Sequence, residues 1–380
     1  MNETTRRKEY TIEHALYLAF ELGEANWKLG FSIGLAQKPR RRKIEARDLI
    51  ALGEEISLAK RRFHLPETAA VKSCYEAGRD GFWLHRYLEE VGVENLVVDS
   101  ASIEVNRRAR RVKTDRIDVG KLLNMLMRYH HGEEKVWSVV HVPGVEEEDM
   151  RHLHRQLSRF KTDRTRHISR IEGVLASQGV RVPLHADFLD KLEATRLWDG
   201  RPLPPGVRAR VAREYSTLQY VQGQIKQLKE ERKELIETSE HPAIEKVRQL
   251  MKLRAIGENS AWLFVMEFFG WRKFRNRREV GALAGLTPTP YQSGEESREQ
   301  GISKAGNRWV RGMAIEIAWC WLRYQPESEL THWFDRNFGH SKRTRKIGIV
   351  ALARRLMITL WRYLDMGEIP EGAQFKPQPG

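Results

Sequence analysis

The first third of the chain alternates short apolar runs with turn-forming residues. Residues 15–22 (ALYLAFEL) and 27–33 (WKLGFSI) are apolar, and the segment 23–26 between them contains glycine and asparagine. This arrangement predicts a β-hairpin. Residues 69–75 and the short run 96–99 (LVVD) predict two further strands.

Helical spacing appears between and after these predicted strands. Residues 81–91 (GFWLHRYLEEV) have apolar positions three and four apart, and Gly92 suits the end of a helix. Residues 114–130 predict a second helix, for which Thr114 is the expected N-cap. Strands that alternate with helices predict a layered α/β domain.

The middle of the chain has a different pattern. Residues 146–175 and 208–240 are rich in Arg, Lys, Glu, Gln and Leu, and the segment 199–206 (DGRPLPPG) separates them. The second stretch predicts a long surface or coiled-coil helix with one apolar stripe. That stripe contains Ile225, Leu228 and Leu235. Such an insert would set the spacing between domains or pair protomers, or it would pack as a solvated helical hairpin on its own domain.

The last third predicts helices joined by a long connection. Residues 310–324 and 347–366 are strongly apolar helices, whereas residues 282–307 read as a long loop. Long loops in compact domains are often functional. Residues 367–380 form a Pro-rich tail that we expect to be mobile.

These patterns together predict three domains and a tail. We expect an α/β domain over residues 10–135, a helical or coiled-coil linker over 136–245, a mostly α domain over 246–366 and a mobile tail over 367–380.

The charge of the chain narrows the choice of partners. Its 380 residues include 66 Lys and Arg against 51 Asp and Glu, a net charge of +15, which favours a polyanion such as nucleic acid. An acidic membrane surface fits the charge alone, but no apolar run approaches the ~20 residues of a spanning helix. The first ten residues lack the apolar core of a signal peptide. Two cysteines are too few for a disulfide framework or a zinc site, so we expect a cytoplasmic protein.

Four acidic residues are candidates for a metal site. Asp115 and Asp118 are three positions apart, which puts their Cβ atoms about 5–6 Å apart on one face of a helix. Two such carboxylates favour a cation between them, and Mg²⁺ binds carboxylates together with phosphate oxygens. Glu21 and Glu76 stand at the ends of predicted strands and could converge on the same site. A solvated helix face remains the simpler explanation of the aspartate pair alone.

The segment that contains the aspartate pair resembles a family signature. Residues 113–123 (KTDRIDVGKLL) are similar to the signature of the DEDD transposases of the one-ten/eleven-eleven insertion-sequence family, and the segments around Glu21 and Glu76 also match. The resemblance implies an N-terminal RuvC-like, RNase H-type domain whose four carboxylates, from Glu21, Glu76, Asp115 and Asp118, bind Mg²⁺. The family has Asp where this chain has Glu21, and the additional methylene moves that carboxylate by about one bond length.

A second resemblance lies in the last third. Residues 282–319 are similar to the core of the family's C-terminal transposase domain, although the usual Pro-Gly-Ile-Gly turn before it reads Ala-Ile-Gly-Glu at residues 255–258. The resemblance implies that Ser293 is a nucleophile that attacks a phosphodiester. From the residues alone, Ser293 would be an ordinary turn serine, and Ser297 and Ser303 would be equal candidates.

Basic residues near both segments are candidates for contacts with nucleic acid. The individual candidates are Lys113, Arg116, Lys304, Asn307, Arg308 and Arg311, of which the last four would bind phosphates or position the serine loop. Basic clusters at residues 39–43, 107–113 and 339–346 predict further backbone contacts, and each one alone could serve solubility.

The family resemblance implies a transposase, a site-specific recombinase of a bacterial or archaeal mobile element that works at the nucleoid. It further implies a dimer or tetramer, an active site that joins Ser293 of one protomer to the acids of another, and a structured non-coding RNA that selects the DNA. Two alternatives remain open. One is a metal nuclease of the Holliday-junction resolvase type in which Ser293 is structural, and the other is a nucleic-acid-binding relative that is weakened at Glu21.

Overall fold

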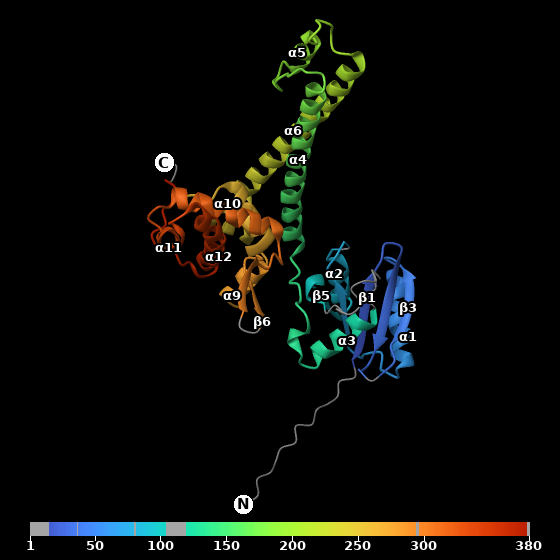
Figure 1. The fold of residues 1–380 in the computed structure, drawn as a ribbon. Helices are drawn as coiled ribbons and strands as arrows, with labels where there is room; N and C mark the ends of the chain where they lie inside the picture. Colours follow the sequence, from blue (N-terminus) through green and yellow to red (C-terminus); the bar gives the residue numbers. More distant parts are fainter. Residues whose placement is uncertain (1–14, 36, 80, 104–118, 294–295, 378–380) are drawn as a thin grey trace, which may run out of the picture. The chain divides into compact units, whose positions relative to one another are not determined.

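The computed structural model describes residues 15–35, 37–79, 81–103, 119–293 and 296–377, and they belong to two compact units (Figure 1). The first unit is Met1–Val142 and the second is Pro143–Gly380. The helical middle, which we expected to be a separate linker, is part of the second unit. Within the described ranges, no helix is long and apolar enough to cross a membrane.

A mixed sheet is the centre of the first unit, and its described strands have the order β3–β2–β1–β4–β5. Strands β1, β2 and β3 are antiparallel neighbours, whereas β1, β4 and β5 run parallel. The strands are β1 (Leu16–Leu22), β2 (Asn26–Ser32), β3 (Arg40–Glu45), β4 (Val71–Glu76) and β5 (Val93–Val98). The basic cluster at residues 39–43 lies largely in β3, a strand that the apolar pattern did not predict, because its outward side chains are all charged.

Helices cover both faces of this sheet. Helices α1 (Leu49–Arg62) and α2 (Trp83–Glu90) pack on one face, and α3 (Val119–His130) packs on the other. The alternation of side chains along β1 explains both layers, because Leu18 joins the core under α1 and α2 while Ala19 joins the core under α3. Short 3₁₀ turns follow at Ser100–Ser102 and Glu134–Val136.

Two long helices, which we call the arm, begin the second unit. Helices α4 (Val145–Ala176) and α6 (Pro205–Thr238) lie side by side, and α5 (Phe188–Ala194) packs at their far end (Figure 1). The predicted stripe of α6 is buried at Ile225 and Leu228, but Leu235 is only half-buried. The buried positions at this end of α6 belong to Arg232 and Ile236.

The remaining helices form the largest core of the chain. They are α7 (Pro242–Met251), α8 (Glu258–Phe264), a π-helical turn η4 (Val265–Phe269), α9 (Arg277–Leu283), α10 (Arg308–Tyr324), α11 (Glu329–Phe338) and α12 (Lys342–Met366). Between α9 and α10 the chain forms a hairpin of β6 (Pro288–Ser293) and β7 (Glu296–Ile302). The prediction of a long loop over residues 282–307 was therefore wrong. Its strands are polar and carry two prolines, so they lack the apolar alternation of a strand.

The tail is also different from the expectation of a mobile segment. Phe375 forms a β-bridge with Leu253, and the Gln325 side chain bonds the backbone of Gln374 in both directions, at 2.9 and 2.7 Å. Lys376 donates a hydrogen bond to the Ile256 carbonyl at 2.7 Å. The described part of the tail is held on the helical core by hydrogen bonds that involve backbone groups, which the apolar pattern cannot predict.

Candidate functional site

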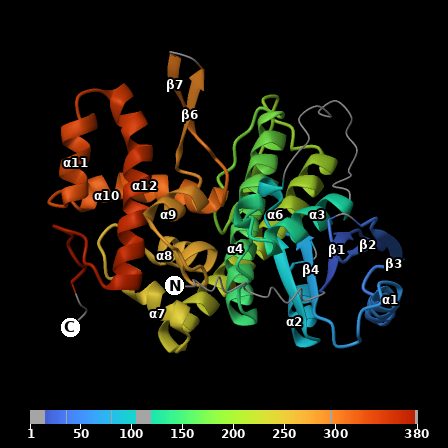
Figure 2. The same ribbon diagram turned by 90° about the horizontal axis from the view of Figure 1, so that it is seen from below.

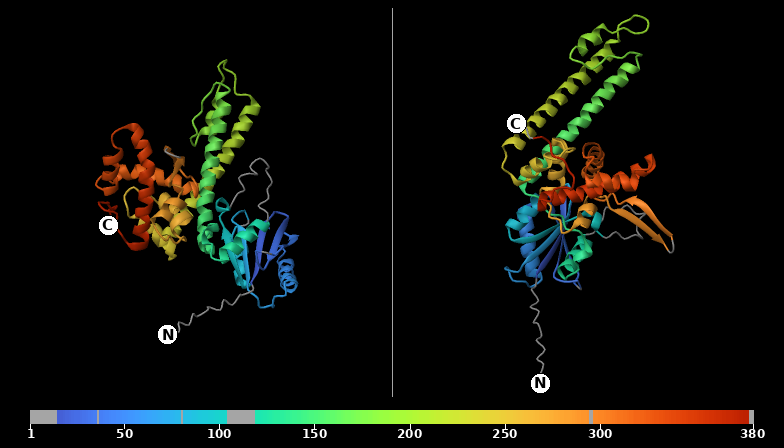
Figure 3. Two further views of the ribbon diagram at one scale, coloured as in Figure 1. Left: turned by 60° about the horizontal axis from the view of Figure 1, so that its bottom comes forward. Right: turned by 90° about the vertical axis from the view of Figure 1, so that its left-hand side faces the viewer.

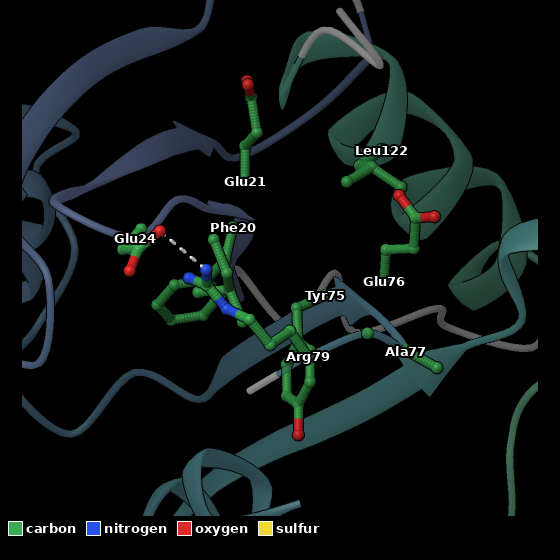
Figure 4. Close-up of a pocket in the computed structure, with 10 residues that line it drawn as sticks. Phe20, Glu21, Glu24, Tyr75, Glu76, Ala77, Arg79 and Leu122 are labelled. Atoms are coloured by element: carbon green, nitrogen blue, oxygen red, sulfur yellow. Dashed lines mark hydrogen bonds and ion pairs between the residues drawn. The ribbon is translucent and has the colours of Figure 1, made fainter. Parts of the chain in front are cut away.

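Glu21 and Glu76 lie side by side at one edge of the first unit's sheet. Strands β1 and β4 are parallel, with Phe20 opposite Tyr75, so the next residues along the two strands are Glu21 and Glu76. Strand alternation directs both glutamates to the face that α3 covers. Figure 4 shows both carboxylates on this side, while Tyr75 points away. The structure therefore places these two strand-end acids next to each other.

A cavity of about 350 Å³ is lined by both glutamates. Leu122 of α3 and Arg79 also contribute to its wall. The Glu21 carboxylate is held by Lys28, which lies opposite it on β2, with Lys28 Nζ 2.7 Å from Glu21 Oε1. Arg79 pairs with Glu24 at 3.0 Å (Figure 4). Within the described ranges, the Glu76 carboxylate has no hydrogen-bond or ion-pair partner.

The direction of α3 relates this cavity to the aspartate pair. Tyr17, near the start of β1, contacts the ring of His130 at the end of α3, with centroids 5.9 Å apart. Val119, the first residue of α3, packs closely on Gly30 of β2. A Cβ added to Gly30 would lie 2.9 Å from Cγ1 of Val119. Helix α3 therefore runs antiparallel to β1, and its N-terminal half lies toward the edge that carries the glutamates. Asp115 and Asp118 precede this helix and lie outside the described residues, as do Lys113, Arg116 and the cluster 107–113.

The two glutamates supply the donor type that a hard cation requires. Mg²⁺ is bound through one or two carboxylates plus water and phosphate oxygens. Glu21 and Glu76 are half-buried, adjacent and open to a cavity, which fits such an ion. In the part of the chain that the structure describes, no three His, Cys, Asp or Glu side chains gather into a metal-binding group. A complete site would need ligands from beyond these ranges.

Ser293 is the last residue of β6, at the far end of the hairpin. Its backbone pairs with Glu296, and the two residues between them lie outside the described ranges. The hairpin extends away from the helices of the second unit (Figures 2 and 3). Ser297, an alternative candidate, pairs with Gln292 one step nearer the helices. Ser303 donates a backbone hydrogen bond to Thr287 at 2.8 Å and belongs to the base of the hairpin.

Close backbone contacts fix this base. Gly285 and Gly306 both have positive φ, and a Cβ on Gly306 would lie 2.1 Å from the carbonyl oxygen of Leu283. Only glycine combines this backbone conformation with such an approach. Arg311 donates a hydrogen bond from Nη1 to the Lys304 carbonyl at 2.9 Å. Arg311 therefore makes a loop-positioning contact, which is one of the two roles predicted for it.

A buried acid connects the hairpin base to the arm. Asn307 is the N-cap of α10, where its Oδ1 accepts from the amides of Trp309 and Val310. Its Nδ2 donates to Glu267 at 2.9 Å, and Arg155 of α4 donates to both Glu267 oxygens at 2.7 and 2.9 Å. Glu267 is 1% exposed and lies in the π-helical turn. Turns of this kind are frequent at functional sites.

Glu267 was not predicted from the sequence. The available signal was its position within the apolar run 261–269 (AWLFVMEFF), since a buried carboxylate must be paired. Lys304 and Arg308 are exposed, and Arg308 lies over the Trp309 ring at 5.7 Å.

The basic clusters have internal partners as well. In β3, Arg40 and Arg42 both pair with Glu55 of α1, at 2.6 and 2.9 Å. In the cluster 339–346, Ser341 caps α12 and Arg345 lies 3.4 Å from Asp335. Part of each of these two clusters therefore takes part in ion pairs or helix capping within the fold.

Comparisons with known proteins identify the class of the chain. A sequence model described as the transposase IS116/IS110/IS902 family matches residues 247–332. A putative transposase y4rJ of Sinorhizobium fredii is 39% identical over 381 residues, which cover 95% of each chain. The transposase for insertion sequence element IS1328 of Yersinia enterocolitica is 22% identical over 59% of this chain and 65% of its own length. A probable family 20 transposase of Pseudomonas aeruginosa is 24% identical over 60% of this chain and 66% of its own length.

The chain is therefore a transposase of the insertion-sequence type. It belongs to the IS116/IS110/IS902 family, as the near full-length match establishes. A transposase acts on DNA, so DNA is its partner.

Proposed function

We propose that this transposase cuts and rejoins DNA with a Mg²⁺-dependent acidic site in its first unit and a covalent serine intermediate in its second. The observation that carries the proposal is the adjacency of Glu21 and Glu76 at one edge of the sheet, open to a single cavity. The strand order and the helices on both faces support an RNase H-like, RuvC-like domain.

Asp115 and Asp118 complete the acidic site in this proposal. Two observations support them, namely the direction of α3 and the presence of Leu122 in the cavity wall. Asp118 directly precedes Val119 in the sequence, and the N-terminal half of α3 lies toward the glutamates. Lys113 and Arg116 would then contact the DNA backbone close to the metal.

Bound Mg²⁺ would polarise a phosphate oxygen and offset the charge that develops during phosphoryl transfer. Ser293 supplies the nucleophile. Its Oγ loses a proton and forms a bond to phosphorus, the bond from phosphorus to one bridging oxygen breaks, and that oxygen gains a proton and leaves as a hydroxyl. The phosphoserine retains the energy of the broken bond for rejoining. Lys304 and Arg308 are exposed and contact phosphates, whereas Asn307 and Arg311 position the hairpin.

The charge of +15 supports further partners. We include in the proposal a structured non-coding RNA that selects the DNA, and a dimer or tetramer in which the serine of one protomer meets the acids of another. The arm supplies a long helical surface for such pairing.

A cleavage assay with the full-length protein tests the chemistry. The substrate is a plasmid that carries the ends of the element, incubated with and without Mg²⁺. We expect Ser293→Ala to abolish DNA-linked protein and strand cleavage, whereas the matched hairpin control Ser297→Ala retains both. Glu76→Gln should lower the cleavage rate by about 100-fold or more, because a ligand carboxylate is lost.

The outcomes separate the alternatives. Retained Mg²⁺-dependent cleavage by Ser293→Ala would contradict the covalent step and favour a metal nuclease. A wild type that binds DNA without cutting it, and that gains activity on Glu21→Asp, would favour a weakened relative.

A further inference from the structure

A second cavity lies in the second unit, and of the residues assigned a role above only Arg308 lines it. Its volume is about 280 Å³, and its walls come from α4, α8 and α10. Apolar side chains, including Leu157 and Leu263, line part of it. The polar and charged lining residues are His154, Ser158, Lys161, Asn259, Arg308 and Glu316.

Asn259 lines this cavity and has an amide group with one bonded end. Its Oδ1 accepts from Arg232 Nη1 at 3.2 Å and from Lys161 Nζ at 3.5 Å. Because both donors are cations, the oxygen must be the atom that faces them. The amide nitrogen has no acceptor among the described residues and remains free to donate to a ligand.

The charges around the cavity are unbalanced. Two arginines near the cavity are neutralised, since Arg155 pairs with Glu267 and Arg232 pairs with Glu258. Lys161 and Arg308, by contrast, have no carboxylate within 4.0 Å in the described part of the chain. Glu316 is the one acid in the lining.

Lys161 lies among more cations than acids. Burial lowers the pKa of Lys161, Arg232, Lys229 and Arg164 lower it further, and Glu258 raises it. Three neighbouring cations against one neighbouring acid favour additional negative charge in the cavity. Hydroxyl, amide, ammonium and guanidinium groups line the cavity, and Lys161 Nζ also donates to Asn259 Oδ1 at 3.5 Å.

We propose that this cavity binds a phosphate group of a nucleic-acid backbone through Lys161, Arg308 and Asn259. The inference rests on the proposed function, in which the protein binds DNA and RNA, and it adds a contact on α4 and α8 that the basic clusters did not indicate. A stacked nucleobase is a poorer occupant, because Arg155 already lies 4.9 Å above the Trp309 ring.

Salt-dependent binding by the full-length protein tests the cavity. The probes are a duplex oligonucleotide of the element end and a transcript of the segment that flanks the gene. Lys161→Gln should weaken binding of one probe about threefold to tenfold and lower the slope of log K against log[salt] by about 0.9 for duplex DNA or about 0.7 for single-stranded RNA. The probe that shows the change identifies the source of the phosphate.

Two further variants distinguish the loss of this site from a general loss of positive charge or of folding. Lys226→Gln removes the same charge from an exposed position of α6, where Lys226 is 80% exposed, and it should leave the slope unchanged. Glu316→Gln should strengthen binding about threefold, because it removes a repelling carboxylate. A misfolded variant would not bind more tightly.

Unchanged slopes for Lys161→Gln with both probes, together with no gain for Glu316→Gln, would overturn the phosphate site while the proposed function stands. A wild type that binds neither probe would overturn both.

Discussion

His154 has the most strongly shifted histidine environment in the described part of the chain. Burial lowers its pKa to about 4, and Arg232, Lys161 and Arg155 act in the same direction against Glu267. Its Nδ1 is buried without a hydrogen-bond partner among the described residues. The folded protein therefore holds this imidazole neutral at pH values at which the unfolded chain would protonate it.

This shift predicts a loss of stability in mild acid. The unfolded state binds a proton below about pH 6.5 and the folded state only near pH 4, so the free energy of unfolding should be about 2 kcal/mol lower at pH 5 than at pH 7. Urea unfolding at the two pH values measures the difference. His154→Leu should remove it, whereas His152→Gln, which changes an exposed histidine of the same helix, should retain it. Equal pH dependence in both variants would contradict the assignment.

At the scale of residues, the sequence indicated the acidic residues of the candidate site but not the basic residues that pair with acids. Glu21 and Glu76 could be found because a carboxylate at the end of an apolar strand is costly unless it is used or exposed. Lys28 could not be assigned to Glu21 without the strand register. Likewise, Arg40 and Arg42 read as surface charges, because Glu55 lies far from them in sequence and meets them only through the packing of α1 on β3.

The contact between α4, η4 and α10 predicts a rescue experiment at the scale of elements. Glu267→Gln removes the carboxylate that neutralises Arg155 and should lower the free energy of unfolding by about 1–3 kcal/mol, a moderate loss because Arg155 is one-third exposed. Asn307→Asp alone places a second carboxylate next to that of Glu267, and the two repel each other. The double variant should recover most of the loss, because the new amide at position 267 then donates to the new carboxylate at position 307, which still caps α10.

Urea unfolding of the two single variants and the double variant gives the coupling energy. The DNA cleavage rate should follow the same order if this network positions the hairpin. Additive losses in the double variant would show that Glu267 and Asn307 act independently.

Helices and strands whose apolar residues recur at regular spacing were predicted from the sequence. Elements that depend on turns, caps or backbone hydrogen bonds were not. The hairpin 288–302 reads as a loop because its residues are polar and its pairing depends on the turns at Gly285 and Gly306. Helix α1 was missed because its mixed composition gives a weak pattern, although Asp48 is an ordinary N-cap. Residues 367–376 read as a free tail because their partners are carbonyl and amide groups of distant loops.

At the scale of the whole molecule, the two units have separate cores. Residues of the first unit fill the two core layers around its sheet, and residues of the second fill the arm and the helical core. The sequence placed a boundary after the α/β part but could not show that the arm shares a core with the C-terminal helices. That sharing depends on long-range contacts such as Met150 with Trp262.

Separate cores predict separate folding. We expect the fragments 1–142 and 143–380 each to unfold cooperatively in urea when produced alone, as monitored by tryptophan fluorescence. The fragment 146–240 should lose most of its stability, because the arm then lacks the core formed by α7 and α8. A fragment 143–380 without a cooperative transition would contradict two independent units.

The hairpin base has a mechanical consequence for the serine. From Pro288 to Ser293 the strand spans about 17 Å, so a rotation of about 10° at Gly285 and Gly306 would swing the tip by about 3 Å. A misplacement of about 1 Å can cost a reaction about 100-fold. The position of the hairpin tip therefore depends on how rigidly its base is held, and the base is held by the hydrogen bonds of Asn307 and Arg311. A force on the arm at Arg155 would reach the hairpin base through the bonds of Glu267, and the displacement would be larger at the tip of the hairpin.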